Sequence, residues 1–259
     1  MQRLRVRYAK RGRLRFTSHR DISRAVERAV RRAGIPVAYS AGFSPHPKIS
    51  YAGAAPTGVA SEAEYLELGV TTPCDPERVR ADLDGSLPPG LDVLDVVEAG
   101  PGGLADRLEA SEWEVRLPGA DPGLAGAAVE KFLAAGAVEV ERLTKKGPRR
   151  FDAREAVLRL AVAGTPPEGT DRTAAQVPGR SCVILRMVVR HMTPAVRPDD
   201  VLTGLRLVAD FAPPVPPEVT RLAQGPLDAS TGALADPFGL DRETTRGGDP
   251  GQASEQVAG

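Results

Sequence analysis

Ala38-Tyr-Ser-Ala-Gly-Phe-Ser-Pro-His-Pro-Lys-Ile-Ser-Tyr-Ala52 is the turn-rich middle of a stretch, Leu14 to Leu68, around which the rest of the chain is organised. The stretch begins with Arg15-Phe-Thr-Ser-His-Arg-Asp21 and holds two of the three histidines, each among other polar groups. Nothing later in the sequence is as dense in residues that could do chemistry. We interpret this stretch as the working face of the protein.

The elements around this face follow the order β-α-β-β-α-β. Apolar and basic residues alternate over 4–8, which predicts a strand with one buried face. A helix follows, because Ser18 and Asp21 are suited to capping and apolar residues recur from Ile22 at spacings of three and four. Further elements are expected as strands at 48–52, 64–70 and 91–97 and a helix at 75–83. This order is that of the ferredoxin-like fold.

The second half repeats the plan in a degenerate form. It is expected to contain strands at 113–117, 138–144, 156–162 and 181–189 and helices at 122–135 and 198–207, with 138–144 and 156–162 paired around a basic turn. From about residue 223 there is little to bury, which predicts disorder. The predicted class is therefore α+β, with two tandem ferredoxin-like units at residues 1–100 and 110–222 and a disordered tail at 223–259.

The charge of the chain is unevenly distributed. The 259 residues have a formal net charge of zero, yet residues 1–50 hold thirteen Lys or Arg against Asp21 and Glu27, a net of +11. So basic a segment favours a polyanionic partner, with nucleic acid first and a membrane surface a distant second. The alternative is a solvated basic face that acidic parts of the same protein neutralise.

Cysteine usage and hydropathy point to a soluble protein of the reducing cytoplasm. Cys74 and Cys182 are far apart in sequence, which argues against a cysteine zinc site, an iron–sulfur cluster or a disulfide framework. The amino terminus has no apolar signal core. No run approaches the roughly 20 apolar residues that span a bilayer.

His46 lies between Pro45 and Pro47, and each proline restricts the backbone on both of its sides. A histidine held this way is suited to recognition or catalysis, and Lys48 could contact a phosphate. The alternative is a rigid turn whose imidazole caps a neighbouring backbone group.

His19 and Asp21 lie at an expected helix start, where free amides favour an anion. The alternative is that Ser18 and Asp21 cap the helix and His19 is merely exposed. The candidate catalytic residues are His46, His19 and Asp21. With Glu62 or Glu64 the histidines could form a metal site, but their spacing matches no known metal motif and no metal is predicted.

Several arginines and aromatic residues could bind nucleic acid. The arginines of the first expected helix, from Arg24 to Arg32, form either a solvated face or a surface that binds a phosphate backbone. In the second case they act together with Arg3, Arg5, Arg7 and Arg13. Tyr39 and Tyr51 could stack on unpaired bases, whereas Phe43 is expected in the core. The basic turn 145–150 suits RNA or keeps a hairpin tip soluble, and His191 is expected to be structural. The candidate nucleic-acid-binding residues are Arg15, His19, Arg20, Arg24, Arg28, Arg31, Tyr39, Ser44, His46, Lys48 and Tyr51.

Common catalytic signatures are absent from the sequence. It has no Walker loop, dinucleotide-binding Gly-x-Gly-x-x-Gly, Gly-x-Ser-x-Gly or His-Glu-x-x-His. It also lacks Cys-x-x-x-Cys-x-x-Cys, the cluster ligands of radical SAM enzymes, and so cannot perform that chemistry alone.

The segments 15–21 and 38–50, together with Pro56-Thr-Gly-Val-Ala-Ser-Glu-Ala-Glu-Tyr65, resemble those of the radical-SAM-associated family. The likeness covers about residues 1–210. In that family the domain stands beside, or is fused to, a cobalamin-binding-type radical SAM protein. The resemblance implies a radical SAM partner that uses S-adenosylmethionine, an iron–sulfur cluster and cobalamin, and it assigns no reaction to this chain.

We expect an accessory module without catalytic activity or cofactor of its own, which binds tRNA or rRNA and presents it to the radical SAM partner. One alternative is an RNA-processing enzyme with His46 or His19 as general acid and base, as in RNA-cleaving Cas endonucleases of similar architecture. The other is a protein-interaction subunit whose basic face meets an acidic partner.

Overall fold

The computed structural model describes residues 1–144, 147–164, 182–228 and 230–247, where it has one large mixed sheet, a separate hairpin and five α-helices. The predicted α+β class is confirmed. No helix in these ranges is long and apolar enough to cross a lipid bilayer.

Residues 2–98 follow the predicted order of elements. The elements are β1 (Gln2–Lys10), the 3₁₀ helix η1 (Gly12–Phe16), α1 (His19–Arg32), β2 (Ile49–Ala52), β3 (Ala60–Val70), α2 (Pro76–Asp84) and β4 (Leu91–Glu98). Their strands pair antiparallel in the order β4-β1-β3-β2. Apolar side chains of β1 and β3, including Leu4, Val6 and Leu66, pack with those of α1 and α2 in one core.

Helix α1 begins where its capping residues predict. The Ser18 hydroxyl accepts a hydrogen bond from the Asp21 amide at 3.3 Å and donates one to the Asp21 carboxylate at 2.7 Å. Ile22, Val26 and Val30 are buried in the core of this half. Because one stripe of α1 is buried, its arginines lie on the face that water reaches.

The second half contains a hairpin whose strand pairing differs from the predicted pairing of 138–144 with 156–162. Its elements are β5 (Ala110–Pro118), α3 (Pro122–Ala134), β6 (Glu139–Thr144), β7 (Gly147–Asp152), β8 (Val157–Ala163), β9 (Cys182–Arg190), α4 (Pro198–Ala209) and β10 (Glu218–Gly225). β6 pairs with β7, and Thr144 lies opposite Gly147 at the end of this pairing. β8 pairs with β9 and not with β6. The four main strands lie in the order β10-β5-β9-β8.

The two halves meet where β10 pairs with β3. The pairing is parallel and short, with Thr220 opposite Ala60 and Arg221 opposite Ser61. The Arg221 guanidinium lies 2.5 Å from the Glu64 carboxylate, and both side chains are 4% exposed. A buried ion pair therefore lies where one half joins the other. The domain division at 1–100 and 110–222 stays a prediction.

The prediction of a disordered tail from residue 223 is wrong for the residues of that segment that the structure describes. Residues 223–225 complete β10, and α5 (Gly239–Gly247) follows. Phe238 is fully buried with its ring 5.4 Å from that of Tyr65, and Asp241 is fully buried too. Two well-placed side chains thus order a segment of low apolar content. Residues 248–259 lie outside the described residues.

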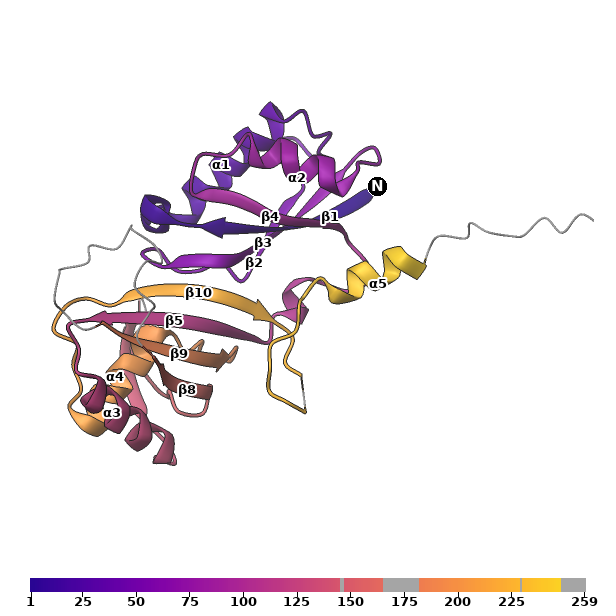
Figure 1. Cartoon of the computed structure of the whole chain (residues 1–259). Coiled ribbons are helices and arrows are strands. Elements are labelled where there is room, and N and C mark those ends of the chain that lie inside the picture. Colours follow the sequence, from indigo (N-terminus) through magenta and orange to yellow (C-terminus); the bar gives the residue numbers. More distant parts are fainter. Residues whose placement is uncertain (145–146, 165–181, 229, 248–259) are drawn as a thin grey trace, which may run out of the picture.

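The strands lie between two pairs of helices. Figure 1 shows α1 and α2 on one side of the strands and α3 and α4 on the opposite side. Each pair covers a separate apolar core. Between them, Leu104, Leu108 and Phe238 pack on Tyr65 of β3, which covers part of the sheet face turned away from α1 and α2.

Candidate nucleic-acid interface

The N-terminal motifs meet along the edge strand β2. Within the described residues β2 pairs with β3 alone, so its other side forms an edge. The His19 ring at the start of α1 contacts the Tyr51 ring of β2, with centroids 5.0 Å apart and an interplanar angle of 78°. Burial raises the pKa of Tyr51 to about 12. This contact fixes the beginning of α1 against the edge strand.

A hairpin across residues 38–48 leads into β2. The Lys48 amide donates to the Ala38 carbonyl at 2.7 Å, and the Ser40 amide donates to the His46 carbonyl at 2.8 Å. The Ser40 hydroxyl accepts from the His46 amide at 3.0 Å. These bonds hold the His46 backbone, and the flanking prolines restrict it further. The exposed His46 side chain lies at a defined position on the surface.

The tip of this hairpin corrects one expectation. Phe43, predicted to lie in the core, has a relative exposure of 106%, and Tyr39 is 47% exposed. Phe16, near the start of α1, is 60% exposed and lies under the Arg15 guanidinium, 4.8 Å from its ring centroid. Three aromatic side chains in this region therefore face water.

The arginines of α1 remain available to a ligand. Those that lie exposed are Arg20, Arg24, Arg28, Arg31 and Arg32. Arg24 lies 3.8 Å from Asp21, and Arg31 lies 4.0 Å from Glu27. Exposed pairs at such distances contribute about 0–1 kcal/mol, so they hold the arginines weakly. Between Glu27 and Glu62 the sequence has no acidic residue, and Glu67 of β3, which lies opposite Ser50 of β2, pairs with Arg3 and Arg5.

The arginines of β1 do not belong to this surface, which corrects the idea of one phosphate track. Arg5 is fully buried and bonded to Asp241 at 2.6 and 2.8 Å and to Glu67 at 3.1 Å. Arg3 pairs with Glu67, and Arg7 donates to a backbone carbonyl. Successive strand residues point to opposite faces, so these side chains lie away from the core under α1. For β1, acidic groups of the same chain neutralise the charge.

The histidines and nearby carboxylates do not converge on a metal site. Glu62 pairs with Arg11 and Glu64 with Arg221, while His19 contacts Tyr51. The residues that the structure describes contain no group of three or more His, Cys, Asp or Glu able to hold a metal ion. The placement of His19 with Ser18 and Asp21 agrees with the capping alternative.

His191 has the structural position expected of it. Its Nδ1 lies 2.6 Å from the Leu108 carbonyl oxygen, and its Nε2 lies 2.7 Å from the hydroxyl of buried Ser111. Nδ1 therefore donates to the carbonyl, and Nε2 accepts from the serine. Partial desolvation of the ring lowers the pKa of His191; the hydrogen bond to the Leu108 carbonyl opposes this, and Arg221 adds a smaller lowering effect. The neutral ring is thus the form that fits.

The second basic turn lies partly outside the described residues. Lys145 and Lys146 are in the part of the chain that is not described. Arg149 is exposed, and Arg150 pairs with Glu141 across the β6–β7 hairpin at 2.8 Å. This pairing agrees with a soluble hairpin tip.

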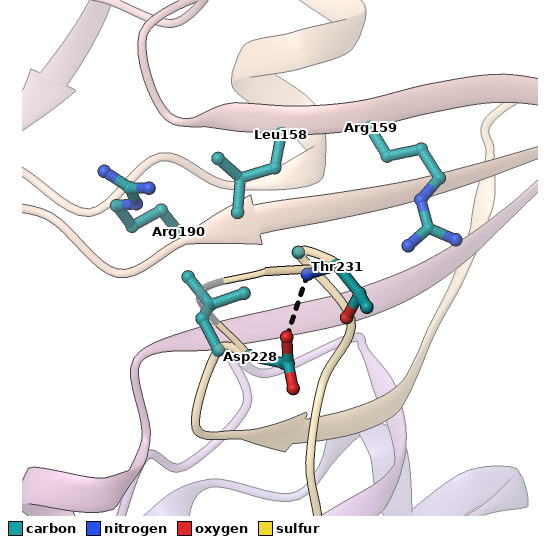
Figure 2. Close-up of a pocket in the computed structure, with 7 residues that line it drawn as sticks. Leu158, Arg159, Arg190, Asp228 and Thr231 are labelled. Atoms are coloured by element: carbon teal, nitrogen blue, oxygen red, sulfur yellow. Dashed lines mark hydrogen bonds between the residues drawn. The ribbon is translucent and has the colours of Figure 1, made fainter.

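A cavity of about 280 Å³ lies between the strands β8 and β9 and the turn at 227–232. It was not predicted from the sequence. Figure 2 shows Arg159 and Arg190 on opposite sides of it, with Asp228 and Thr231 on the turn. The Asp228 carboxylate accepts hydrogen bonds from the Ser230 hydroxyl at 2.6 Å and from the Thr231 amide at 2.8 Å, and these bonds lower the Asp228 pKa to about 2. No pattern in the sequence points to this cavity, because its turn lies in the segment 223–259 that is expected to be a disordered tail.

The comparisons with known proteins give a family. No curated protein matches the chain. The family DUF2344, described as uncharacterized protein conserved in bacteria, matches residues 3–198, which include the hairpin and both helices of the first half. That match spans well over half of the sequence, and the chain therefore belongs to the DUF2344 family.

Proposed function

We propose that this protein is a cytoplasmic accessory module that binds RNA, a tRNA or rRNA, through α1 and the 38–48 hairpin and presents it to a radical SAM partner. One observation carries the proposal: exposed Arg28, Arg31 and Arg32 and the exposed rings of Tyr39 and Phe43 lie within residues 28–61, a stretch that contains no acidic residue. Arginines bind phosphates, and aromatic rings stack on bases. Together they provide the two contacts that RNA needs.

The arrangement of the strands supports a tandem ferredoxin-like interpretation. In each half the last of the four main strands lies beside the first, followed by the third and the second. In other proteins with this fold the open sheet face often binds RNA, but that is an analogy of fold. Here Leu104, Leu108 and Phe238 cover part of that face. We therefore assign RNA binding to the helix and edge strand.

The radical SAM partner is proposed from the resemblance of the three N-terminal segments. The partner would bring S-adenosylmethionine, an iron–sulfur cluster and cobalamin, and this chain would bring the RNA. Co-purification of the two proteins should persist after nuclease treatment if they bind directly. Loss of the complex on RNA digestion would mean that RNA alone bridges them.

The decisive experiment measures affinity for total tRNA and for rRNA fragments against salt concentration. The triple variant Arg24→Ala/Arg28→Ala/Arg31→Ala should bind more weakly and with a flatter salt dependence, because each lost phosphate contact lowers the slope by about 0.7–0.9. The matched control removes three exposed arginines elsewhere, Arg78, Arg159 and Arg206. Equal effects of the two triple variants, or no RNA affinity at low salt, would remove the proposal.

The rival RNA-processing function depends on His46 or His19. His46 is exposed in the hairpin, and His19 is held by Tyr51, so each ring has its own surroundings. Incubation of RNA with the wild type and with His46→Ala tests this rival. Cleavage by the wild type that the variant loses would replace an accessory role with an enzymatic one.

A further inference from the structure

The hairpin at residues 38–48 places an aromatic side chain where the fold does not need it. Phe43 has a relative exposure of 106%, so it is as accessible as in an isolated peptide and packs on nothing in the described part of the chain. Gly42 beside it has a φ of +128°, a conformation that favours glycine. The tip of the hairpin thus extends a bare ring into water.

The base of the hairpin is ordered before any ligand arrives. The bonds joining Ala38 to Lys48 and Ser40 to His46 close it, and a further bond from the Ala38 amide to the Gly69 carbonyl at 2.7 Å ties it to β3. A ring on an ordered support loses little conformational entropy when it binds. The hairpin is therefore pre-organised for contact through its tip.

The surroundings of the tip favour a negatively charged ligand with flat faces. His46, three residues after Phe43, and Lys48, at the base, are exposed in the same hairpin. No acidic residue occurs between Glu27 and Glu62 in the sequence, and Glu67, which lies opposite Ser50 of β2, is already paired with Arg3 and Arg5. Unpaired bases have a free face for stacking and phosphates beside it, whereas in a duplex the faces are covered by neighbouring base pairs.

We infer that the RNA bound here is single-stranded at the site, and that Phe43 stacks on an unpaired base of a loop, bulge or end. The inference rests on the proposed RNA-binding function and specifies its substrate class. Lys48, at the base of the hairpin, contacts a phosphate farther along the same RNA strand. β2 follows Lys48 and is four residues long, about 13 Å, and it contains Tyr51, which contacts His19. Phe16, on Arg15, offers a second exposed ring near the start of α1.

The test compares an RNA stem-loop with a blunt duplex that has the same stem sequence. Phe43→Ala should weaken stem-loop binding by about 5- to 150-fold, which is the effect of losing one stacked base, and should leave duplex binding unchanged. Phe43→Trp should retain affinity, and its fluorescence should be quenched by the stem-loop but not by the duplex. Leu143→Ala is the matched control, since Leu143 is 82% exposed in the other half.

The outcomes separate this inference from the proposed function. If the wild type binds neither RNA at low salt, both fail. If it binds RNA but treats stem-loop and duplex alike, or if Phe43→Ala binds the stem-loop normally, this inference alone is overturned. If Phe43→Ala keeps RNA affinity and loses co-purification with the radical SAM protein, the tip is a protein contact and the inference is wrong.

Discussion

Removing the charge of Glu64 should destabilise the protein far more than an ordinary surface change. Glu64 and Arg221 are each 4% exposed and lie 2.5 Å apart. Burial lowers the pKa of Arg221 against the opposing attraction of Glu64. At an effective dielectric of 20 and a charge separation of about 4 Å, that attraction is about 4 kcal/mol. The intact pair offsets its desolvation, but a lone Arg221 would not be compensated.

Glu64→Gln preserves the shape of the side chain and removes its charge. The expected loss in free energy of unfolding is about 3–5 kcal/mol, the usual cost of breaking one side of a buried pair. Small domains have about 5–15 kcal/mol in total, so the loss is a large fraction. Urea unfolding followed by Trp113 fluorescence measures it, because that ring lies under Arg221 at 5.5 Å.

Glu62→Gln is the matched control. Glu62 lies on β3, as Glu64 does, and pairs with Arg11. The Glu62 and Arg11 side chains are 28% and 46% exposed. Exposed pairs contribute about 0–1 kcal/mol, so this variant should unfold almost as the wild type does. Equal losses for Glu62→Gln and Glu64→Gln would refute the reasoning. The double variant Glu64→Leu/Arg221→Met should recover part of the stability, because both members of the pair are removed and only Lys10, bonded to the Ala55 carbonyl, is left as a buried charge there.

Three further predictions concern other parts of the fold. Asp241→Ala should leave two arginines short of counter-charge and detach residues 236–247, which limited proteolysis would detect as faster cleavage there. The folded-state pKa of His191 lies below the unfolded value of 6.5, so its contribution to stability is complete above pH 6.5 and is lost as the pH falls through the folded pKa. Thermal unfolding measured from pH 7 downward should show this loss of stability. His191→Gln should make the loss smaller. Gly204→Ala should lower the melting temperature, because the new Cβ would lie 2.6 Å from Phe132, whereas Gly126→Ala, with nothing within 4 Å, should raise it.

The sequence predicted elements whose signals are local. Helix α1 begins as its capping residues indicate, since Ser18 and Asp21 bond to one another across three residues. The β-α-β-β-α-β order of residues 2–98 was likewise read from periodicity. The sequence predicts a basic turn at 145–150, whereas residues 147–152 form a strand opposite 139–144, so the β6–β7 pairing does not follow from it.

The sequence could not predict contacts between distant residues. The alternation in β1 indicated that Arg5 points away from the core under α1, but its partner Asp241 lies 236 positions later in a segment of tail-like composition. The same limit applied to Phe43. A phenylalanine between small residues is usually buried, and only the closed hairpin places it at an exposed tip.

The position of β10 has a consequence for synthesis on the ribosome. It is the last strand in the chain, yet it lies between β3 and β5 in the middle of the sheet. Until residue 225 has been translated and has left the exit tunnel, one edge of each half stays open to pairing with other chains. The nascent protein therefore closes its centre last, and a stop codon shortly before residue 218 would leave both edges open permanently.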